Sequence, residues 1–386
     1  MKKLAFITSE MTGIGGVATV VKRLTDVLKK DFEVIFIGVN NNFSNEFKCI
    51  EFETQKYMSK SQKIRSVIIR AINKYTKFLN NERNVKLLKK AYFSDKALAK
   101  LKEILDIEKV DCCIATAGAN SMLLGYLSEE IDAHCIGWQL NSYDAYFNNK
   151  YKYMWHQNYV FKDAVKRLDA YVVLNDDDRE KMHENMNIEA KVIHNPTSYE
   201  SDVCSTLDNK VFMAAGHLWE GKGFDLLIDS FSIFCKKNED WLLHIYGVGP
   251  DGPKLEEQAK KLGLVNKVIF KGNIPDTKEA FLQASVFCLS SRWEGMPMIT
   301  LESLEMGVPI ISYDISAIKP IIDNNENGIV VDKFDVDKFA IAMEKLAHND
   351  DDRKLYGKNA KIKSKEFNID FIVSKWKDEF SRNKEC

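Results

Sequence analysis

The chain has 386 residues, of which 45% are hydrophobic and 29% charged, and its formal net charge is −1. This length suits two domains better than one ordinary core, and a net charge so close to zero gives no general reason to expect a nucleic-acid partner. The eight cysteines show no C-x-x-C pair and no metal-ligand spacing with histidine, which indicates reduced thiols in a cytoplasmic protein.

The N-terminus, MKKLAFITSE, reads as a first strand rather than a signal peptide. No apolar run approaches the length of a membrane span. Short apolar runs then alternate with longer amphipathic ones along the whole chain. In the first half, buried strands are predicted at Leu4–Thr8, Val34–Val39, Val110–Ala115, Cys135–Trp138 and Tyr171–Leu174.

The second half repeats this alternation after the polar segment Asn195–Asn209, which we interpret as an interdomain linker. Its predicted strands are Val211–Ala215, Leu242–Tyr246, Val268–Phe270, Val286–Leu289, Pro309–Ser312 and Ile329–Val331. Strand–helix alternation that occurs twice predicts two doubly wound α/β domains.

A glycine-rich loop, Thr12–Ala18, follows the first predicted strand and includes Gly15 and Gly16. Glycines between a strand and a helix let backbone N–H groups approach a ligand closely, although a tight turn alone would also explain them. The loop lacks the G-x-G-x-x-G spacing, and Asn40–Asn42 stand where an acidic residue would follow the second strand. A dinucleotide site is therefore disfavoured.

Residues 56–102 are strongly basic, with fourteen Lys or Arg and two acids. Apolar residues fall at helical spacing within this segment: Ile64, Val67, Ile68, Ala71, Ile72, Tyr75 and Phe78. Lys63, Arg65, Arg70, Lys74 and Lys77 are predicted on the opposite face. Two interpretations stay open. The helix could lie on an anionic membrane surface, or its apolar face could enter the domain core while the basic face is solvated.

The loops of the second half carry groups that suit a phosphorylated sugar. Lys222 stands between a strand and a helix, and glycines that permit close backbone contact follow the next strand, at Gly247 and Gly249. The stretch Ser290–Pro309 reads strand end, loop, helix and turn, with Pro297 predicted as the first helical residue. A helix N-terminus suits phosphate, and two carboxylates, Glu294 and Glu302, suit hydroxyls.

The E-G-x-P loop, with a second glutamate eight positions after Glu294 and a following G-V-P-I-I, resembles the signature of family 4 retaining glycosyltransferases with the GT-B fold. Without that resemblance, the pair reads as a loop glutamate and a helix-face glutamate. The resemblance implies an α/β fold of two Rossmann-like domains facing each other across a cleft. It implies an acceptor domain over 1–196, a nucleotide-sugar domain over 197–365, and a C-terminal helix over 366–386 that packs back on the first domain.

The resemblance also assigns site residues. Lys222 fits the lysine that clamps the donor diphosphate, whereas His217 stands where these enzymes carry an arginine. Glu294 and Lys222 are the implied catalytic residues. The implied donor-binding residues are Gly15, Gly16, Gly216, His217, Lys222, Gly247, Gly249, Asn273, Gly295, Met296, Pro297, Met298 and Glu302. Leu140 occupies the place of a common histidine, so the candidate acceptor contacts are its neighbours Gln139, Asn141 and Tyr143.

The resemblance implies transfer of a hexose or N-acetylhexosamine from a UDP-sugar to a sugar or lipid-linked acceptor, in surface polysaccharide or glycoconjugate synthesis. No metal and no cofactor are implied. The implied location is the cytoplasm, with association at the inner face of the membrane through residues 56–102 as an open option. Two alternatives remain: a GT-B sugar-nucleotide epimerase and a non-catalytic nucleotide-sugar-binding protein.

Overall fold

The structure is a computed structural model that describes residues 1–10, 15–39, 46–148, 154–274 and 276–382. Its contacts divide the chain into two units, which we call unit 1 (Met1–His194 with Ile372–Cys386) and unit 2 (Asn195–Phe371). Among the described residues, no helix combines the length and the apolar character needed to cross a membrane.

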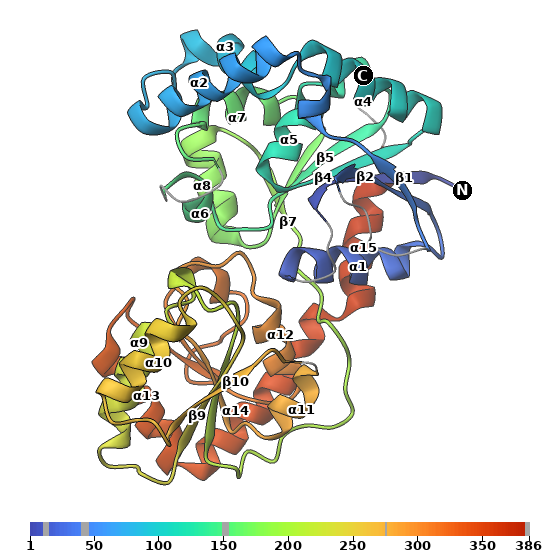
Figure 1. The fold of residues 1–386 in the computed structure, drawn as a ribbon. Coiled ribbons are helices and arrows are strands. Elements are labelled where there is room, and N and C mark those ends of the chain that lie inside the picture. The colour runs from blue at the N-terminus through green and yellow to red at the C-terminus, as the bar shows by residue number, and fades with distance from the viewer. Residues whose placement is uncertain (11–14, 40–45, 149–153, 275, 383–386) are drawn as a thin grey trace. The chain divides into compact units, whose positions relative to one another are not determined.

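Unit 1 is built on a seven-stranded parallel sheet with the order β3-β2-β1-β4-β5-β6-β7 (Figure 1). The strands are β1 (Lys3–Glu10), β2 (Glu33–Val39), β3 (Lys48–Glu51), β4 (Cys112–Thr116), β5 (His134–Trp138), β6 (Ala170–Val173) and β7 (Ala190–Val192). The central strands β4, β5 and β6 are buried at every residue, as expected for a parallel sheet covered on both faces. The sequence did not predict β3, a half-exposed edge strand whose residues KCIE lack a continuous apolar run.

Four helices of unit 1 form successive layers on one side of this sheet. α5 packs on β5, α7 on α5, α3 on α7 and α2 on α3, so that α2 is the outermost of this series (Figure 1). The helices of unit 1 that precede residue 194 are α1 (Gly16–Leu28), α2 (Lys60–Thr76), α3 (Val85–Tyr92), α4 (Asp95–Glu108), α5 (Ala117–Gly125), α6 (Tyr143–Phe147), α7 (Asn158–Val165) and α8 (Asp176–Met186).

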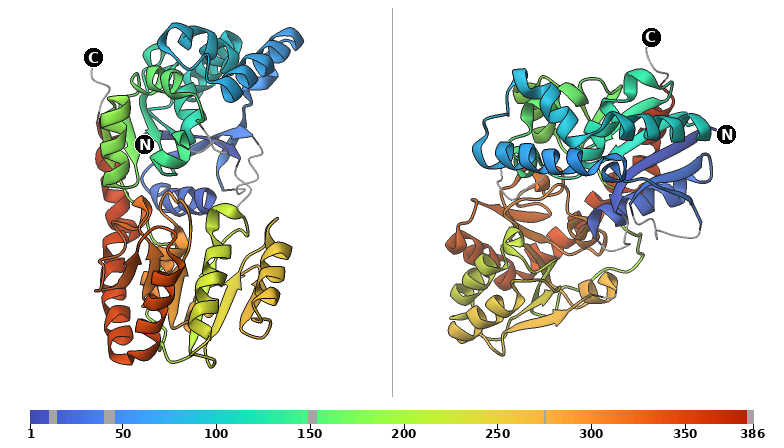
Figure 2. Two further views of the ribbon diagram at one scale, coloured as in Figure 1. Left: turned by 90° about the vertical axis from the view of Figure 1, so that its left-hand side faces the viewer. Right: turned by 45° about the horizontal axis from the view of Figure 1, so that its top comes forward.

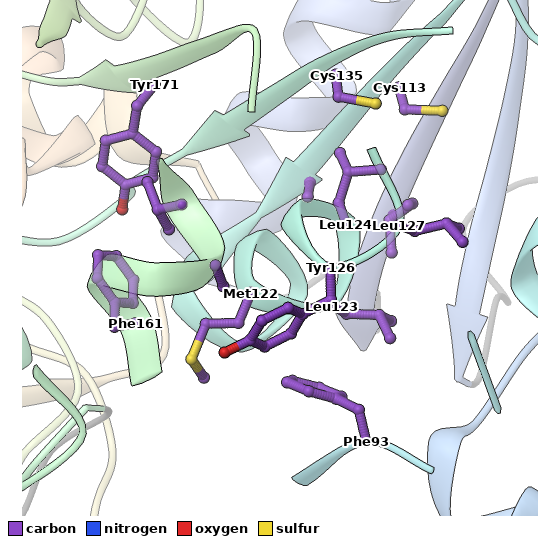
Figure 3. Packing of buried hydrophobic residues seen from close by; sticks show 14 of the residues in the cluster. Phe93, Cys113, Met122, Leu123, Leu124, Tyr126, Leu127, Cys135, Phe161 and Tyr171 are labelled. Carbon is purple, nitrogen blue, oxygen red and sulfur yellow. The ribbon is translucent and has the colours of Figure 1, made fainter. Parts of the chain in front are cut away.

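The core of unit 1 fills the space between the sheet and these helices (Figure 3). Cys113 and Cys135 occupy paired positions of β4 and β5 and are fully buried. On the helical side, the ring of Tyr126 packs against Phe93 with centroids 6.0 Å apart. Such close packing of large side chains fixes the outer helices relative to the sheet.

The last helix, α15 (Ile369–Phe380), completes unit 1, as the sequence predicted for the C-terminal segment. Trp376 is 1% exposed and packs on Trp138 of β5, with ring centroids 4.8 Å apart. Glu379 is also buried and accepts two bonds, of 2.8 and 2.7 Å, from the Lys191 ammonium group. Residues distant in the sequence therefore share one core, and Figure 2 shows the C-terminal helix in red from two further sides.

Unit 2 is a second doubly wound unit with a six-stranded parallel sheet in the order β10-β9-β8-β11-β12-β13. Its strands are β8 (Val211–Ala215), β9 (Leu242–Tyr246), β10 (Val268–Gly272), β11 (Val286–Leu289), β12 (Ile310–Tyr313) and β13 (Gly328–Val331). Its helices are α9 (Phe224–Cys235), α10 (Gly252–Lys261), α11 (Thr277–Leu282), α12 (Met298–Glu305), α13 (Val336–His348) and α14 (Asp350–Lys363). The prediction of two doubly wound α/β sheets is confirmed.

The sequence predicted an acceptor domain that ends at residue 196 and a nucleotide-sugar domain that ends at residue 365. The functions of these two domains stay predictions. In the structure, the chain leaves unit 2 inside α15, after Phe371. The predicted linker, Asn195–Asn209, contains no helix or strand and belongs to unit 2.

Candidate nucleotide-sugar site

The strand order of unit 2 reverses between β8 and β11, which are neighbours in the sheet. In open α/β sheets, ligands bind outside the carboxyl ends of the strands at such a reversal. The loop after β8 carries Lys222 and the loop after β11 carries Glu294. The topology therefore brings together two predicted residues that are 72 positions apart in the sequence.

Lys222 ends a single 3₁₀ turn, Glu220–Lys222, and Gly223 is the N-cap of α9. Gly223 has a φ of 63°, in the left-handed region, and a Cβ atom on it would lie 2.1 Å from the carbonyl oxygen of Ser290. Only glycine allows this approach without strain. The backbones of the two loops are thus in direct contact beside Lys222.

Lys222 and Glu294 form an ion pair, with Nζ 2.5 Å from Oε1. The Ser291 hydroxyl donates to the same carboxylate oxygen over 2.7 Å. The side chains remain partly exposed, 23% for Lys222 and 13% for Glu294. Because an ammonium group has three donors, Lys222 can bind an anionic oxygen while it keeps its bond to Glu294.

Arg292, which sequence reasoning missed, ties the two loops together. Its guanidinium donates to both carboxylate oxygens of Asp225 at 2.8 and 2.7 Å, and to the Glu220 carbonyl at 2.6 Å. Its backbone N–H donates to the Gly221 carbonyl over 2.9 Å. Burial raises the pKa of Asp225, but hydrogen bonds and charge from Arg292 outweigh it and leave that pKa lowered. No local sequence pattern indicates that Arg292 and Asp225, which are 67 positions apart, form an ion pair.

Glu302 lies in α12 and is 7% exposed. Its Oε1 accepts a 2.5 Å bond from the Ser198 hydroxyl, while its buried Oε2 accepts no bond of normal geometry within the described part of the chain. Burial raises the pKa of Glu302, although hydrogen bonding by Ser198 and Thr277 opposes this. A buried carboxylate oxygen without a donor suits a ligand hydroxyl.

The residues between the two glutamates are mostly enclosed. Gly295, Met296, Pro297 and Met298 are all buried. Pro297 is the N-cap of α12 rather than its first helical residue, so that prediction was one position early. The Met296 carbonyl accepts from the Asn195 amide over 3.1 Å, which holds this loop on the segment that precedes β8.

The glycines after β9 allow close packing between two loops of unit 2. A Cβ on Gly247, where φ is 135°, would lie 1.8 Å from the Gly216 carbonyl oxygen, and one on Gly249 would lie 2.3 Å from that of Leu218. Their absence of side chains lets the loops after β8 and β9 pack together. His217, in the first of these loops, and Asn273, just after β10, are exposed. Direct donor contacts by these residues stay predictions.

Five further candidates belong to unit 1. Gly15 and Gly16 start α1 after β1 and face open space, with no atom within 4 Å of an added Cβ. Gln139 is fully buried and accepts from the Tyr171 hydroxyl over 3.1 Å. Asn141 accepts from the Ser142 N–H over 2.9 Å. Tyr143 is buried at the start of α6. Their roles stay predictions; residues 12–14 and 40–42 lie outside the described residues.

A metal site does not emerge from the part of the chain that the structure describes, where no group of three or more His, Cys, Asp or Glu side chains has a suitable arrangement.

The chain resembles known proteins in sequence and in fold. Residues 202–363 match the family model described as glycosyl transferases group 1. An uncharacterized glycosyltransferase of Haemophilus influenzae is 25% identical over 98% of this chain and 99% of its own. The GalNAc-alpha-(1->4)-GalNAc-alpha-(1->3)-diNAcBac-PP-undecaprenol alpha-1,4-N-acetyl-D-galactosaminyltransferase of Campylobacter jejuni is 26% identical over 97% of each chain.

Among solved structures, a TarM variant from S. aureus in complex with fondaparinux, alpha-GlcNAc-glycerol and UDP superimposes with a TM-score of 0.75. It is 15% identical, and the match covers 99% of this chain and all of that one. At this identity the likeness concerns the fold.

Proposed function

The chain belongs to the glycosyl transferases group 1 family, and on this basis we propose that it is a retaining hexosyltransferase. In this proposal a hexose or N-acetylhexosamine moves from a UDP-sugar to a saccharide or lipid-linked saccharide. The acceptor hydroxyl attacks the sugar on the face that the diphosphate leaves, and the departing phosphate takes the proton. This reaction would serve the synthesis of a surface polysaccharide or glycoconjugate.

The observation that carries the proposal is the Lys222–Glu294 pair at the sheet reversal, with Glu302 eight residues on. Lys222 supplies fixed positive charge where the diphosphate develops negative charge, and Gly295, Met296 and Met298 supply backbone N–H groups near the start of α12. Glu294 would hold donor-sugar hydroxyls. The unsatisfied Oε2 of Glu302 would accept from a ribose hydroxyl.

The nature of the acceptor is inferred from a relative of this chain. The Campylobacter jejuni relative, 26% identical over almost its whole length, is named for an acceptor linked to undecaprenol diphosphate. An acceptor of this kind would place the enzyme in the cytoplasm at the inner face of the membrane. We propose catalysis without a metal ion, so that a chelator such as EDTA should leave the rate unchanged.

The test is incubation of the full chain with a panel of UDP-sugars and with saccharide or lipid-linked acceptors, with UDP release followed. Lys222→Met and Glu294→Gln should each reduce the rate by roughly 100- to 1000-fold, because they remove groups aimed at the transition state. Lys254→Met, which removes an exposed lysine of α10, is the matched control and should keep the wild-type rate. The anomeric configuration of the product should match that of the donor.

Wild-type rates in both site variants would contradict the assignment of the site. Conversion of the UDP-sugar without any acceptor would indicate an epimerase instead. Binding of the UDP-sugar, seen as a thermal shift but without turnover on any acceptor, would indicate a non-catalytic binding protein.

A further inference from the structure

Helix α2 presents its apolar residues to solvent. Five of them and Phe78, just beyond the helix, form what we call the apolar stripe and are exposed by 43% to 79%: Ile64, Val67, Ile68, Ile72, Tyr75 and Phe78. The interpretation in which this face enters the core of unit 1 is therefore wrong. Soluble surfaces rarely leave so many large side chains of one face uncovered, and such patches usually mark a docking site.

The inward face of α2 carries polar side chains together with Ile69, which packs against the core of unit 1. Ser66 and Asn73 are its buried residues, and with 3.6 residues per turn they lie on the side away from the apolar stripe. The Ser66 hydroxyl donates to the Ala91 carbonyl of α3, and the Asn73 amide donates to the His156 carbonyl. Arg70 lies over the ring of Tyr92 at 4.9 Å. These contacts fix the rotation of the helix, so the stripe faces outward in the folded chain.

Basic residues border the stripe. Lys60, Lys63, Arg65, Lys74 and Lys77 are exposed, and none of them pairs with a carboxylate among the described residues. The surrounding segment, residues 56–102, has fourteen basic residues and two acids, in a chain whose net charge is −1. This segment, which includes α2 and α3, therefore carries a local excess of positive charge.

Two hollows continue the same surface along α3. An apolar one of about 490 Å³ lies between α2 and α3 and is lined by Ile64, Ile68, Ile69 and Leu87, with Arg65 and Ser61 beside them. A second, of about 470 Å³, lies between α3 and α7. Lysines and an arginine dominate it (Lys86, Lys89, Lys162, Lys166 and Arg167), together with the carboxylates of Glu82 and Asp163.

We propose that the outer face of α2 and α3 docks on an anionic phospholipid bilayer. The apolar stripe enters the boundary between headgroups and acyl chains, and the bordering lysines and arginine contact lipid phosphates. The charges favour this occupant over a second copy of the chain, because a symmetric contact through this face would oppose like charges. The inference does not depend on the proposed transfer reaction.

The test is co-sedimentation of the full chain with vesicles of phosphatidylcholine, with or without phosphatidylglycerol. The wild-type chain should bind only the anionic vesicles, and added salt should weaken the binding. A triple variant with Ile64→Ser, Val67→Ser and Ile68→Ser should bind at least about 10-fold more weakly. The matched control is Ile341→Ser, Leu355→Ser and Ile362→Ser, which changes three comparably exposed residues of α13 and α14 and should bind like the wild type.

A charge variant separates the two contributions. Lys63→Glu with Lys74→Glu should also lose about 10-fold in binding to anionic vesicles, whereas Lys254→Glu with Lys358→Glu, at exposed lysines of unit 2, should not. Circular dichroism should show all variants folded, because every altered side chain is exposed.

Three results would overturn the inference. The wild-type chain could fail to bind anionic vesicles, or it could bind neutral and anionic vesicles alike. The triple serine variant could also bind anionic vesicles as strongly as the wild type does. If light scattering showed a wild-type dimer that the triple serine variant loses, a second copy would be the occupant of this face.

Discussion

Arg292 holds the loop of Lys222 against the loop of Glu294, although it is not among the residues expected to touch the donor. Its bidentate bond to Asp225 and its bond to the Glu220 carbonyl need a planar guanidinium. A lysine at this position has a single nitrogen and could not form the bidentate bond to Asp225. The distance between the two site residues thus depends on a third side chain.

We therefore expect Arg292→Lys to lower the free energy of unfolding by roughly 1 to 3 kcal/mol, measured by urea denaturation. The same variant should reduce kcat more than it raises KM, because it loosens the site without removing a ligand contact. Arg167→Lys is the control, since Arg167 is 35% exposed and bonds to surface carboxylates. Equal effects of the two variants would show that Arg292 acts only as a surface ion pair.

Asp178 is a buried carboxyl at the start of α8, 1% exposed, that accepts from the Tyr143 N–H over 2.8 Å. Burial raises its pKa from 3.8 to about 7, against the lowering effect of hydrogen bonds from Tyr143 and Asn175. The folded chain therefore holds this proton more tightly than the unfolded chain does. The stabilising effect is complete below pH 3.8 and is lost as the pH rises to about 7.

Asp178→Asn should remove this part of the pH dependence of the free energy of unfolding, which amounts to on the order of 2 to 4 kcal/mol between pH 4 and pH 8. Urea denaturation at several pH values would measure it. Asp176→Asn, at an exposed neighbouring residue that pairs with Arg179, should keep the wild-type dependence. A stability profile of Asp178→Asn that matches the wild type would contradict the assignment.

The loops after β8 and β9 pack together because Gly247 has no side chain. We expect Gly247→Ala to cost about 3 kcal/mol or more, since the new Cβ would both strain the backbone at a φ of 135° and collide with the Gly216 carbonyl. The variant should also weaken UDP binding, because the clash displaces the loop that leads to Lys222. Urea denaturation and calorimetric titration with UDP would measure the two effects.

Gly263→Ala separates these causes. Gly263 also has a positive φ, of 74°, but nothing lies within 4 Å of an added Cβ. This control should therefore cost only about 1 kcal/mol, the strain of a left-handed residue, and leave UDP binding intact. If Gly247→Ala and Gly263→Ala lowered the free energy of unfolding equally, the contact between the loops would not contribute to stability.

Helix α15 belongs to both units, since it begins in unit 2 and ends in the core of unit 1. Trp376→Ala should remove a fully buried ring that packs on Trp138 and cost about 3 to 5 kcal/mol. Hydrogen exchange should then accelerate in β5 and β6 while β8 and β11 stay protected.

Phe371→Ala is the control from the same helix, because Phe371 is 49% exposed, and it should leave exchange nearly unchanged. Faster exchange in unit 2 after Trp376→Ala would mean that the two units unfold together rather than one by one.

The sequence by itself determined the two parallel sheets, because their central strands are continuous apolar runs such as Cys112–Thr116 that only a doubly covered sheet can bury. It also determined the spacing of Glu294 and Glu302 and the loop position of Lys222, which are local properties. It did not indicate β3, whose edge position leaves its residues KCIE without a buried pattern.

Only the tertiary structure decided which groups meet. Arg292 and Asp225, or Ser198 and Glu302, are far apart in the chain, so no local pattern records that their side chains bond. For α2, helical spacing set the apolar stripe, but it could not tell which side of the helix faces the protein. Ser66 and Asn73 donate to neighbouring backbone carbonyls, since a buried polar group needs a partner inside the fold. These bonds hold α2 in the orientation in which the apolar stripe faces outward.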